Sequence, residues 1–218
     1  MDGSVPPACR PALHPAIQEV LLDGAALGRR VREMGQRVAA DYAGRTPHLV
    51  GVLKGAVPFA ADLLRAIPLP DVTVDFLGIA SYGRSTETSG VVRFTKDLDE
   101  PIAGRHVLIV EDIVDTGLTL AYLREHLAAR GPASLAVAAM LDKPARRKTQ
   151  VRVEYVGFSI PDRFAVGYGL DCGGHFRHLP YVAALRPEAA AALSAGPQGP
   201  EAVRPRPASS PIPAHPAP

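Results

Sequence analysis

The sequence predicts an α/β fold in which a mainly parallel central sheet carries helices on both faces. Short apolar runs that suit buried strands alternate along the chain with segments whose apolar residues recur every three to four positions. This alternation of strand and helix is typical of a parallel sheet covered on both sides. We find neither an internal repeat nor a second domain.

The proline distribution places this fold in the middle of the chain. Of 22 prolines among 218 residues, four lie in residues 1–15 and eight in residues 196–218. The C-terminal stretch, rich in Ala, Pro and Ser, has too little apolar surface to offset its ordering entropy. The whole chain is nevertheless 47% apolar and can bury a core. We therefore expect one domain over residues 16–195 between two disordered tails, 1–15 and 196–218.

The first elements of this domain are a helix, a strand, a second helix and a second strand. Asp23 caps the first helix and Gly44 ends it, and its apolar positions share one face. These positions are Leu27, Val31, Met34, Val38 and Tyr42. The second helix, 57–64, lies between the predicted strands 48–53 and 72–77.

The second half of the domain begins with a polar loop. Residues 81–90 lack core-forming periodicity, as lid loops often do. Residues 106–110 give the strongest signal of a buried strand, and a helix over 118–127 ends before Gly131. Three further strands are predicted over 135–141, 151–156 and 164–167.

Composition and charge exclude several classes of protein. The formal net charge of +2 is too small to favour nonspecific binding to nucleic acid or membranes. No apolar run approaches the roughly 20 residues of a membrane-spanning helix, and the N-terminus lacks the pattern of a signal peptide. We therefore expect a cytoplasmic protein. Cys9 and Cys172 are too few for a zinc site or a disulfide framework.

The segment with the clearest chemical content runs from Val107 to Thr119 (VLIVEDIVDTGLT). Its apolar start predicts a strand that ends at two adjacent carboxylates, Glu111 and Asp112. In open α/β sheets ligands bind beyond the carboxyl ends of the strands. Because burying both acids would cost free energy, we expect them in a cleft, where they reach water, a cation or ligand hydroxyls.

A turn into a helix follows these acids. Asp115, Thr116, Gly117 and Thr119 let backbone N–H groups converge at a helix N-terminus, where the helix dipole favours an anion. The pattern therefore predicts a phosphate-binding turn over 116–119. In the alternative interpretation, Asp115 and Thr116 only cap the helix and the acids are a solvated strand end. The sequence contains neither a P-loop nor a GxGxxG after a strand.

The same segment resembles the phosphoribosyl pyrophosphate motif of type I phosphoribosyltransferases, and specifically of hypoxanthine (guanine) phosphoribosyltransferases. Four more stretches match in order: GVLKG at 51–55, the polar loop at 81–86, KDLD at 96–99 and VGFSIPDRFAVGYGLD at 156–171. The resemblance spans roughly Ile17 to Leu185. It implies that family's fold, a mainly parallel sheet with a small hood and a flexible lid loop. Residues 172–175 depart from the family pattern.

The resemblance implies roles for the residues of the motif. The ribose hydroxyls and Mg²⁺ would be bound by Glu111 and Asp112, and a second Mg²⁺ by Asp171. The 5′-phosphate would be bound by Thr116, Gly117, Leu118 and Thr119. Asp115 would act as general base near N7 of the purine, a role typically worth about 10²–10⁴ in rate.

The resemblance also implies sites for pyrophosphate and purine. Pyrophosphate would be bound by Lys54, Gly55 and Arg177, with a cis peptide between Leu53 and Lys54. Lys143 would donate to the purine O6, Phe164 would stack on the ring, and the backbone of Ala165 would meet its exocyclic edge. Ser81 and Tyr82 would belong to the lid, and Arg147 would support the phosphate-binding turn.

The implied activity is purine salvage, in which hypoxanthine or guanine receives the phosphoribosyl group with Mg²⁺. The family also implies a homodimer or homotetramer, and the low net charge leads us to expect neither nucleic acid nor a membrane as a partner. One alternative is a non-catalytic regulator on the same fold that senses a nucleotide and binds RNA or DNA through the basic residues 146–148. A phospho-receiver domain is disfavoured, because about a hundred residues precede the acidic pair.

Overall fold

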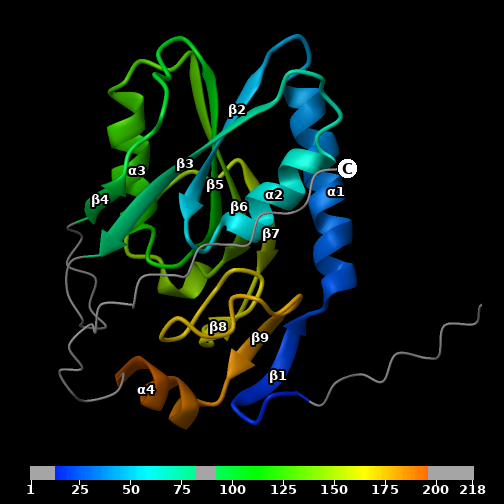
Figure 1. Cartoon of the computed structure of the whole chain (residues 1–218), viewed down its shortest axis with the longest axis vertical. Coiled ribbons are helices and arrows are strands. Elements are labelled where there is room, and N and C mark those ends of the chain that lie inside the picture. The colour runs from blue at the N-terminus through cyan, green and yellow to red at the C-terminus, as the bar shows by residue number, and fades with distance from the viewer. Residues whose placement is uncertain (1–12, 82–91, 196–218) are drawn as a thin grey trace, which may run out of the picture.

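The computed structural model describes residues 13–81 and 92–195. Residues 1–12 of the expected N-terminal tail, the whole expected C-terminal tail and Tyr82 lie outside the described residues. Figure 1 shows a large sheet flanked by helices and, below it, a smaller unit that contains β1, β8, β9 and α4. No helix in the described ranges is long and apolar enough to cross a membrane.

The large sheet has six strands in the order β4-β3-β2-β5-β6-β7. Their bounds are β2 (Pro47–Leu53), β3 (Thr73–Ser81), β4 (Val92–Lys96), β5 (His106–Val114), β6 (Ser134–Asp142) and β7 (Tyr155–Ser159). All neighbouring pairs are parallel except β3 and β4, which pair antiparallel. The predicted fold class, a mainly parallel α/β sheet, is therefore confirmed.

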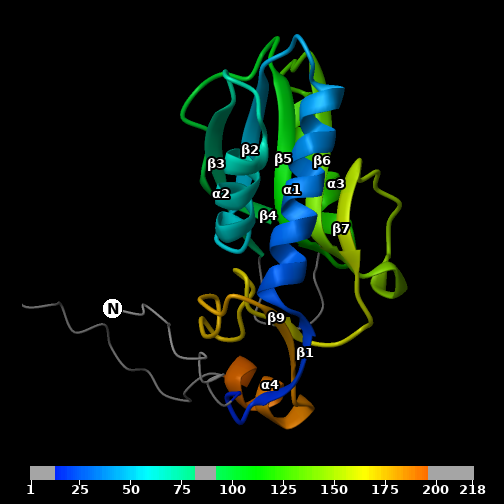
Figure 2. The ribbon, with the colours of Figure 1, turned by 90° about the vertical axis from the view of Figure 1, so that its right-hand side faces the viewer.

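Helices cover both faces of this sheet. The helices α1 (Gly24–Asp41) and α2 (Val57–Ala66) lie on one face, as Figure 2 shows, and α3 (Leu118–Ala128) lies on the other. Successive residues of β5 point to opposite faces, so Leu108 packs with α1 and α2 while Ile109 packs with α3. Asp23 caps α1 as predicted, because its Oδ1 accepts a hydrogen bond from the Ala26 amide at 2.7 Å.

The smaller unit is a three-stranded antiparallel sheet in the order β1-β9-β8 with one helix. Its elements are β1 (Ile17–Leu22), β8 (Ala165–Val166), β9 (Val182–Leu185) and α4 (Pro187–Ala195). We call residues 13–22 and 164–195 the hood, because Figure 1 shows them beyond the carboxyl ends of the parallel strands. The His14 ring, which the sequence places in the N-terminal tail, packs edge-on against Phe176 at 5.2 Å between centroids.

The hood is joined to the large sheet beside the turn that follows β2. The Tyr168 hydroxyl donates a hydrogen bond to Asp62 Oδ2 on α2 at 2.7 Å. Gly169, with a φ of +99°, passes so close to this turn that a Cβ atom there would lie 1.9 Å from the Gly55 carbonyl oxygen. This backbone-to-backbone approach requires glycine at position 169, and it brings the hood over the end of β2.

Three predicted strand boundaries were wrong. The strand predicted over 72–77 continues to Ser81, because β4 pairs with it there. The strand that was expected to end at Glu111 continues to Val114, because β6 still pairs with it up to Asp142. The strand predicted over 151–156 lies instead at Tyr155–Ser159, where β6 offers hydrogen-bonding partners. Val151 and Val153 pack against the core without joining the sheet. Their apolar side chains are explained by this packing and do not indicate a strand.

Candidate active site

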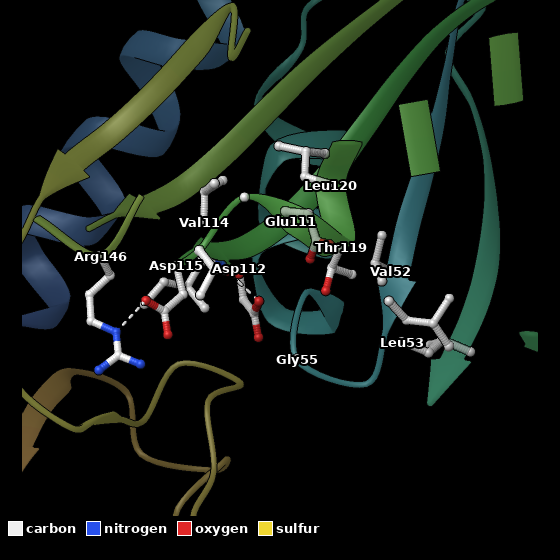
Figure 3. A pocket seen from close by; sticks show the side chains of 14 residues that line it. Val52, Leu53, Gly55, Glu111, Asp112, Val114, Asp115, Thr119, Leu120 and Arg146 are labelled. Atoms are coloured by element: carbon white, nitrogen blue, oxygen red, sulfur yellow. Dashed lines mark hydrogen bonds and ion pairs between the residues drawn. The ribbon is translucent and has the colours of Figure 1, made fainter. Parts of the chain in front are cut away.

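The candidate site lies where the strand order reverses. From β2 the chain moves to β3 on one side, and from β5 it moves through α3 to β6 on the other. Ligands of open α/β sheets bind at such a switch point, beyond the carboxyl ends of the strands. Pairing between β2 and β5 stops at Gly51 and Val110. The strands separate there, and a cavity of about 290 Å³ opens between their ends (Figure 3).

Glu111 and Asp112 form part of the wall of this cavity. Glu111 is only 7% exposed, which excludes the interpretation of a solvated strand end. Burial and the neighbouring Asp112 carboxylate raise the pKa of Glu111. Burial also raises the pKa of Asp112 to about 6, although the Ile113 amide and the charge of Arg177 oppose this shift. A buried acid next to a half-buried one makes the site ready to bind a positive charge.

The turn after β2 runs directly against Asp112. A Cβ atom at Gly55 would lie 1.6 Å from Asp112 Oδ2, so the backbone there passes the carboxylate at a distance that only glycine allows. The peptide bond between Leu53 and Lys54 is cis, which confirms the expectation drawn from the resemblance. Lys54 itself is exposed. The two segments with the clearest sequence motifs therefore meet at one point.

The predicted phosphate-binding turn begins α3. Gly117 is the N-cap of the helix with a φ of +82°, so it offers no capping side chain, and the Leu118 amide of the first turn donates a long hydrogen bond of 3.4 Å to Thr116 Oγ1. The Thr116 carbonyl accepts hydrogen bonds from the amides of Lys148 at 2.9 Å and Thr149 at 3.3 Å, which turns it away from the helix end. The N-terminus of α3 and its dipole therefore face the cavity, as an anion site needs.

Arg147 packs beneath this turn. A Cβ atom at Gly117 would lie 3.0 Å from Arg147 Cδ, and the Arg147 guanidinium forms an ion pair with Asp142 at the end of β6. The side chain of Arg147 is mostly buried. These contacts fit the supporting position that the resemblance implies for Arg147.

Asp115 lies at the other end of the cavity and is bound by an arginine that the sequence did not single out as a site residue. Arg146 Nε donates a hydrogen bond to Asp115 Oδ1 at 3.0 Å, and both residues line the cavity (Figure 3). The sequence placed Arg146 only in a basic cluster with Arg147 and Lys148. The signal that could have indicated Arg146 as a site residue is its position three residues after Lys143, in a turn that begins with Pro144.

The hood contributes Arg177 and Asp171, which bind each other. Arg177 Nη2 lies 2.6 Å from Asp171 Oδ1, and Arg177 Nη1 donates to the Gly169 carbonyl at 2.7 Å. The charges of both residues act on the pKa of Asp112, so the structure brings the expected pyrophosphate and second metal residues to the acid pair. Neither residue lines the 290 Å³ cavity itself.

The residues expected to bind the purine lie beyond the wall of this cavity. Lys143 is 8% exposed; burial lowers its pKa, against the charges of Asp115 and Asp162. Phe164 is 44% exposed, and Ala165 is buried in β8. Ser81, expected in the lid, is the last residue of β3.

The acid pair suits a hard cation. Carboxylate oxygens are the ligands that Mg²⁺ prefers. The pKa values of Glu111 and Asp112 are raised, so a nearby positive charge would stabilise their ionised forms. Within the described ranges, no group of three or more His, Cys, Asp or Glu residues could hold a metal ion. Mg²⁺ is usually bound through one or two carboxylates together with substrate phosphates and water, and Glu111 and Asp112 could supply such carboxylates.

Known proteins resemble this chain over most of its length. Residues 18–172 match the family model of the phosphoribosyl transferase domain. The hypoxanthine-guanine phosphoribosyltransferase of Bacillus subtilis is 44% identical over 171 residues, which is 78% of this chain and 94% of that protein. The bifunctional protein TilS/HprT of Listeria innocua is 45% identical over 177 residues, but this chain, of which 81% is matched, covers only 27% of it.

A solved structure shows the same fold. The hypoxanthine phosphoribosyl transferase of Trypanosoma cruzi superposes with a TM-score of 0.79 at 39% identity, covering 85% of this chain and 100% of that one. Its structure was described for the role of the C-terminal region in oligomeric state and enzymatic activity.

Replacing Asp112 with Asn should raise the melting temperature of the ligand-free protein, and more at pH 8 than at pH 5. The pKa of Asp112 rises from 3.8 in the unfolded chain to about 6 in the folded protein. Folding is therefore destabilised as the pH rises through this interval, and the loss is complete above it. Asn removes this charge, and we expect a gain on the order of 3 kcal/mol at pH 8 and a smaller one at pH 5. Thermal unfolding at both pH values measures it.

Asp75→Asn is the matched control. Asp75 is also buried; burial raises its pKa, but the amides of Phe76 and Asp99 and the Lys96 ammonium outweigh burial and lower it. The ionised form therefore stabilises the fold above pH 4, and Asp75→Asn should lower the melting temperature at pH 8. A melting temperature that falls in both variants would contradict the destabilising charge at Asp112.

Proposed function

This chain belongs to the phosphoribosyl transferase family, and we propose that it is a purine salvage enzyme. It transfers the 5-phosphoribosyl group from phosphoribosyl pyrophosphate to hypoxanthine or guanine, and the products are IMP or GMP and pyrophosphate. The observation that carries this proposal is one cavity whose wall contains the acid pair, the phosphate-binding turn and Asp115. That arrangement offers separate places for a sugar, its phosphate and a proton acceptor.

The sugar phosphate is bound between β5 and α3. The 5′-phosphate accepts hydrogen bonds from the turn at the N-terminus of α3, which consists of Thr116, Gly117, Leu118 and Thr119. Glu111 and Asp112 bind the ribose hydroxyls and hold Mg²⁺, and Asp171 holds a second one. When bound, Mg²⁺ neutralises negative charge on the pyrophosphate oxygens. The two carboxylates also lie where positive charge develops on the ribose as the bond to pyrophosphate breaks.

The purine is bound on the side of Asp115. N9 of the purine attacks C1 of the ribose, and the proton on N7 passes to the Asp115 carboxylate, which acts as general base. Lys143 donates a hydrogen bond to O6, so it must keep its proton despite the lowering of its pKa by burial. The exposed ring of Phe164 stacks on the purine, and the backbone at Ala165 meets the exocyclic edge.

Pyrophosphate leaves between the β2 turn and the hood. Lys54, the backbone of Gly55 and Arg177 bind its oxygens. Gly55 leaves no room between this backbone and Asp112, so the phosphate oxygens approach the amide from the open side. Ser81 and Tyr82 belong to the lid that excludes water from the activated ribose.

The contacts of the basic cluster argue against the nucleic-acid-binding regulator. Arg146 is paired with Asp115, and Arg147 is paired with Asp142. Their charges are therefore compensated inside the domain and do not form a free basic surface. We also propose that the enzyme works in the cytoplasm as a homodimer or homotetramer.

Purified protein with phosphoribosyl pyrophosphate and Mg²⁺ should release pyrophosphate when hypoxanthine or guanine is added. Asp115→Asn should lower kcat by about 10²–10⁴, because the amide cannot accept the N7 proton. EDTA should stop the reaction in both proteins. If the wild type turned over no 6-oxopurine, the proposed activity would be wrong; full activity of Asp115→Asn would remove Asp115 as base.

Removing residues 196–218 should leave kcat and KM nearly unchanged, because we propose that residues 16–195 form the whole catalytic domain. The T. cruzi structure was described for the role of its C-terminal region in oligomeric state, so we would also measure the oligomeric state of this protein. Sedimentation of the full chain and of the truncated chain should give the same assembly. A large loss of turnover, or dissociation, would show that the C-terminal segment belongs to the functional unit.

A further inference from the structure

We propose that Arg146 is a positioning residue that fixes the carboxylate of Asp115. The inference rests on the proposed function, in which Asp115 is the general base. Arg146 Nε donates to Asp115 Oδ1 at 3.0 Å, and this bond lies in the wall of the cavity. Figure 3 shows the second oxygen of Asp115 pointing to the side to which the Asp112 carboxylate also points.

The backbone holds Arg146 opposite Asp115. Two hydrogen bonds connect the residues that flank Asp115 to the segment that carries Arg146. The Lys143 amide donates to the Val114 carbonyl at 2.9 Å, and the Lys148 amide donates to the Thr116 carbonyl at 2.9 Å. Since both flanks are tied, the ion pair between the two side chains does not depend on a mobile loop.

The charges around Arg146 fix the guanidinium as well. Its Nη1 lies 3.8 Å from Asp162 Oδ2, so the side chain bridges two carboxylates from different segments. The negative charge of Asp115 also acts on Lys143, the residue that precedes the same turn. The Arg146 side chain is 42% exposed, so its bond to Asp115 is weaker than a fully buried one would be.

One oxygen of the base is thus held by a cation and the other is left for the purine. A base that a third group orients is a recurring arrangement in enzymes, because it keeps the accepting atom in line with the proton. Without the Arg146 side chain, Asp115 can rotate about its side-chain bonds and meets N7 less often. The cost falls on the chemical step, because the bond involves the base and not the groups that bind phosphate.

Arg146→Gln should lower kcat about tenfold, which is less than the loss of the base itself. The KM for phosphoribosyl pyrophosphate should change less than about twofold, since no phosphate-binding residue is touched. Arg146→Lys keeps a cation and should recover part of the lost kcat. The control is Arg152→Gln, because Arg152 is also an arginine paired with a carboxylate but its side chain is 82% exposed and outside the cavity wall. That variant should match the wild type.

A double-mutant cycle separates positioning from a merely structural effect. In the Asp115→Asn background, Arg146→Gln should change kcat less than about twofold, because the residue then has no base to position. A further tenfold loss in that background, or a wild-type kcat in Arg146→Gln, would overturn the proposal for Arg146. Absence of turnover in the wild type would overturn the proposed function, whereas turnover with additive effects would overturn only the role of Arg146.

Discussion

The contact between the Gly55 backbone and the Asp112 carboxylate is the constraint around which the site is built. β2 and β5 are adjacent strands that separate beyond Gly51 and Val110, and the turn after β2 closes back onto the acid at the end of β5. Gly169 of the hood then closes onto Gly55 in the same way. Two backbones and one carboxylate from distant parts of the sequence meet here, and any side chain at the two glycines would separate them. The cavity owes its shape to this packing.

Charge is balanced around the cavity by pairs that a substrate can rearrange. Arg177 is held by Asp171, Arg146 by Asp115 and Arg147 by Asp142. The negative charges of Glu111 and Asp112 are unfavourable in the ligand-free protein, since burial raises the pKa of both carboxyl groups. The N-terminus of α3 is the opposite case, a positive dipole end whose Leu118 amide makes only a long hydrogen bond of 3.4 Å to Thr116 Oγ1. A ligand that carries phosphates and a bound cation would neutralise the two acids and bind the helix N-terminus at once. The free energy that these two features cost in the ligand-free protein is then recovered on binding.

The parts that the sequence predicted are those written in local patterns. Apolar periodicity indicated α1, α2 and α3, because each helix buries one apolar face against the sheet. The apolar run before Glu111 indicated β5, because both faces of this strand are buried. The elements without such a pattern were missed. β4 is a short edge strand in which apolar and polar residues alternate. In the hood, β1 and β9 are short and pair with each other although they lie near opposite ends of the domain sequence. Arg146 was missed as a site residue because its role depends on two long-range backbone bonds.

If the close approach at Gly55 shapes the site, a single methyl group there must impair binding of phosphoribosyl pyrophosphate. Isothermal titration of phosphoribosyl pyrophosphate with Mg²⁺ into Gly55→Ala measures this. Gly28→Ala adds the same methyl on α1, where the nearest atom is Arg32 Nη1 at 3.6 Å. With both variants folded, as thermal unfolding can establish, we expect binding at least about tenfold weaker in Gly55→Ala, or about 1.4 kcal/mol, and unchanged in Gly28→Ala. Equal affinity in Gly55→Ala and the wild type would contradict the account.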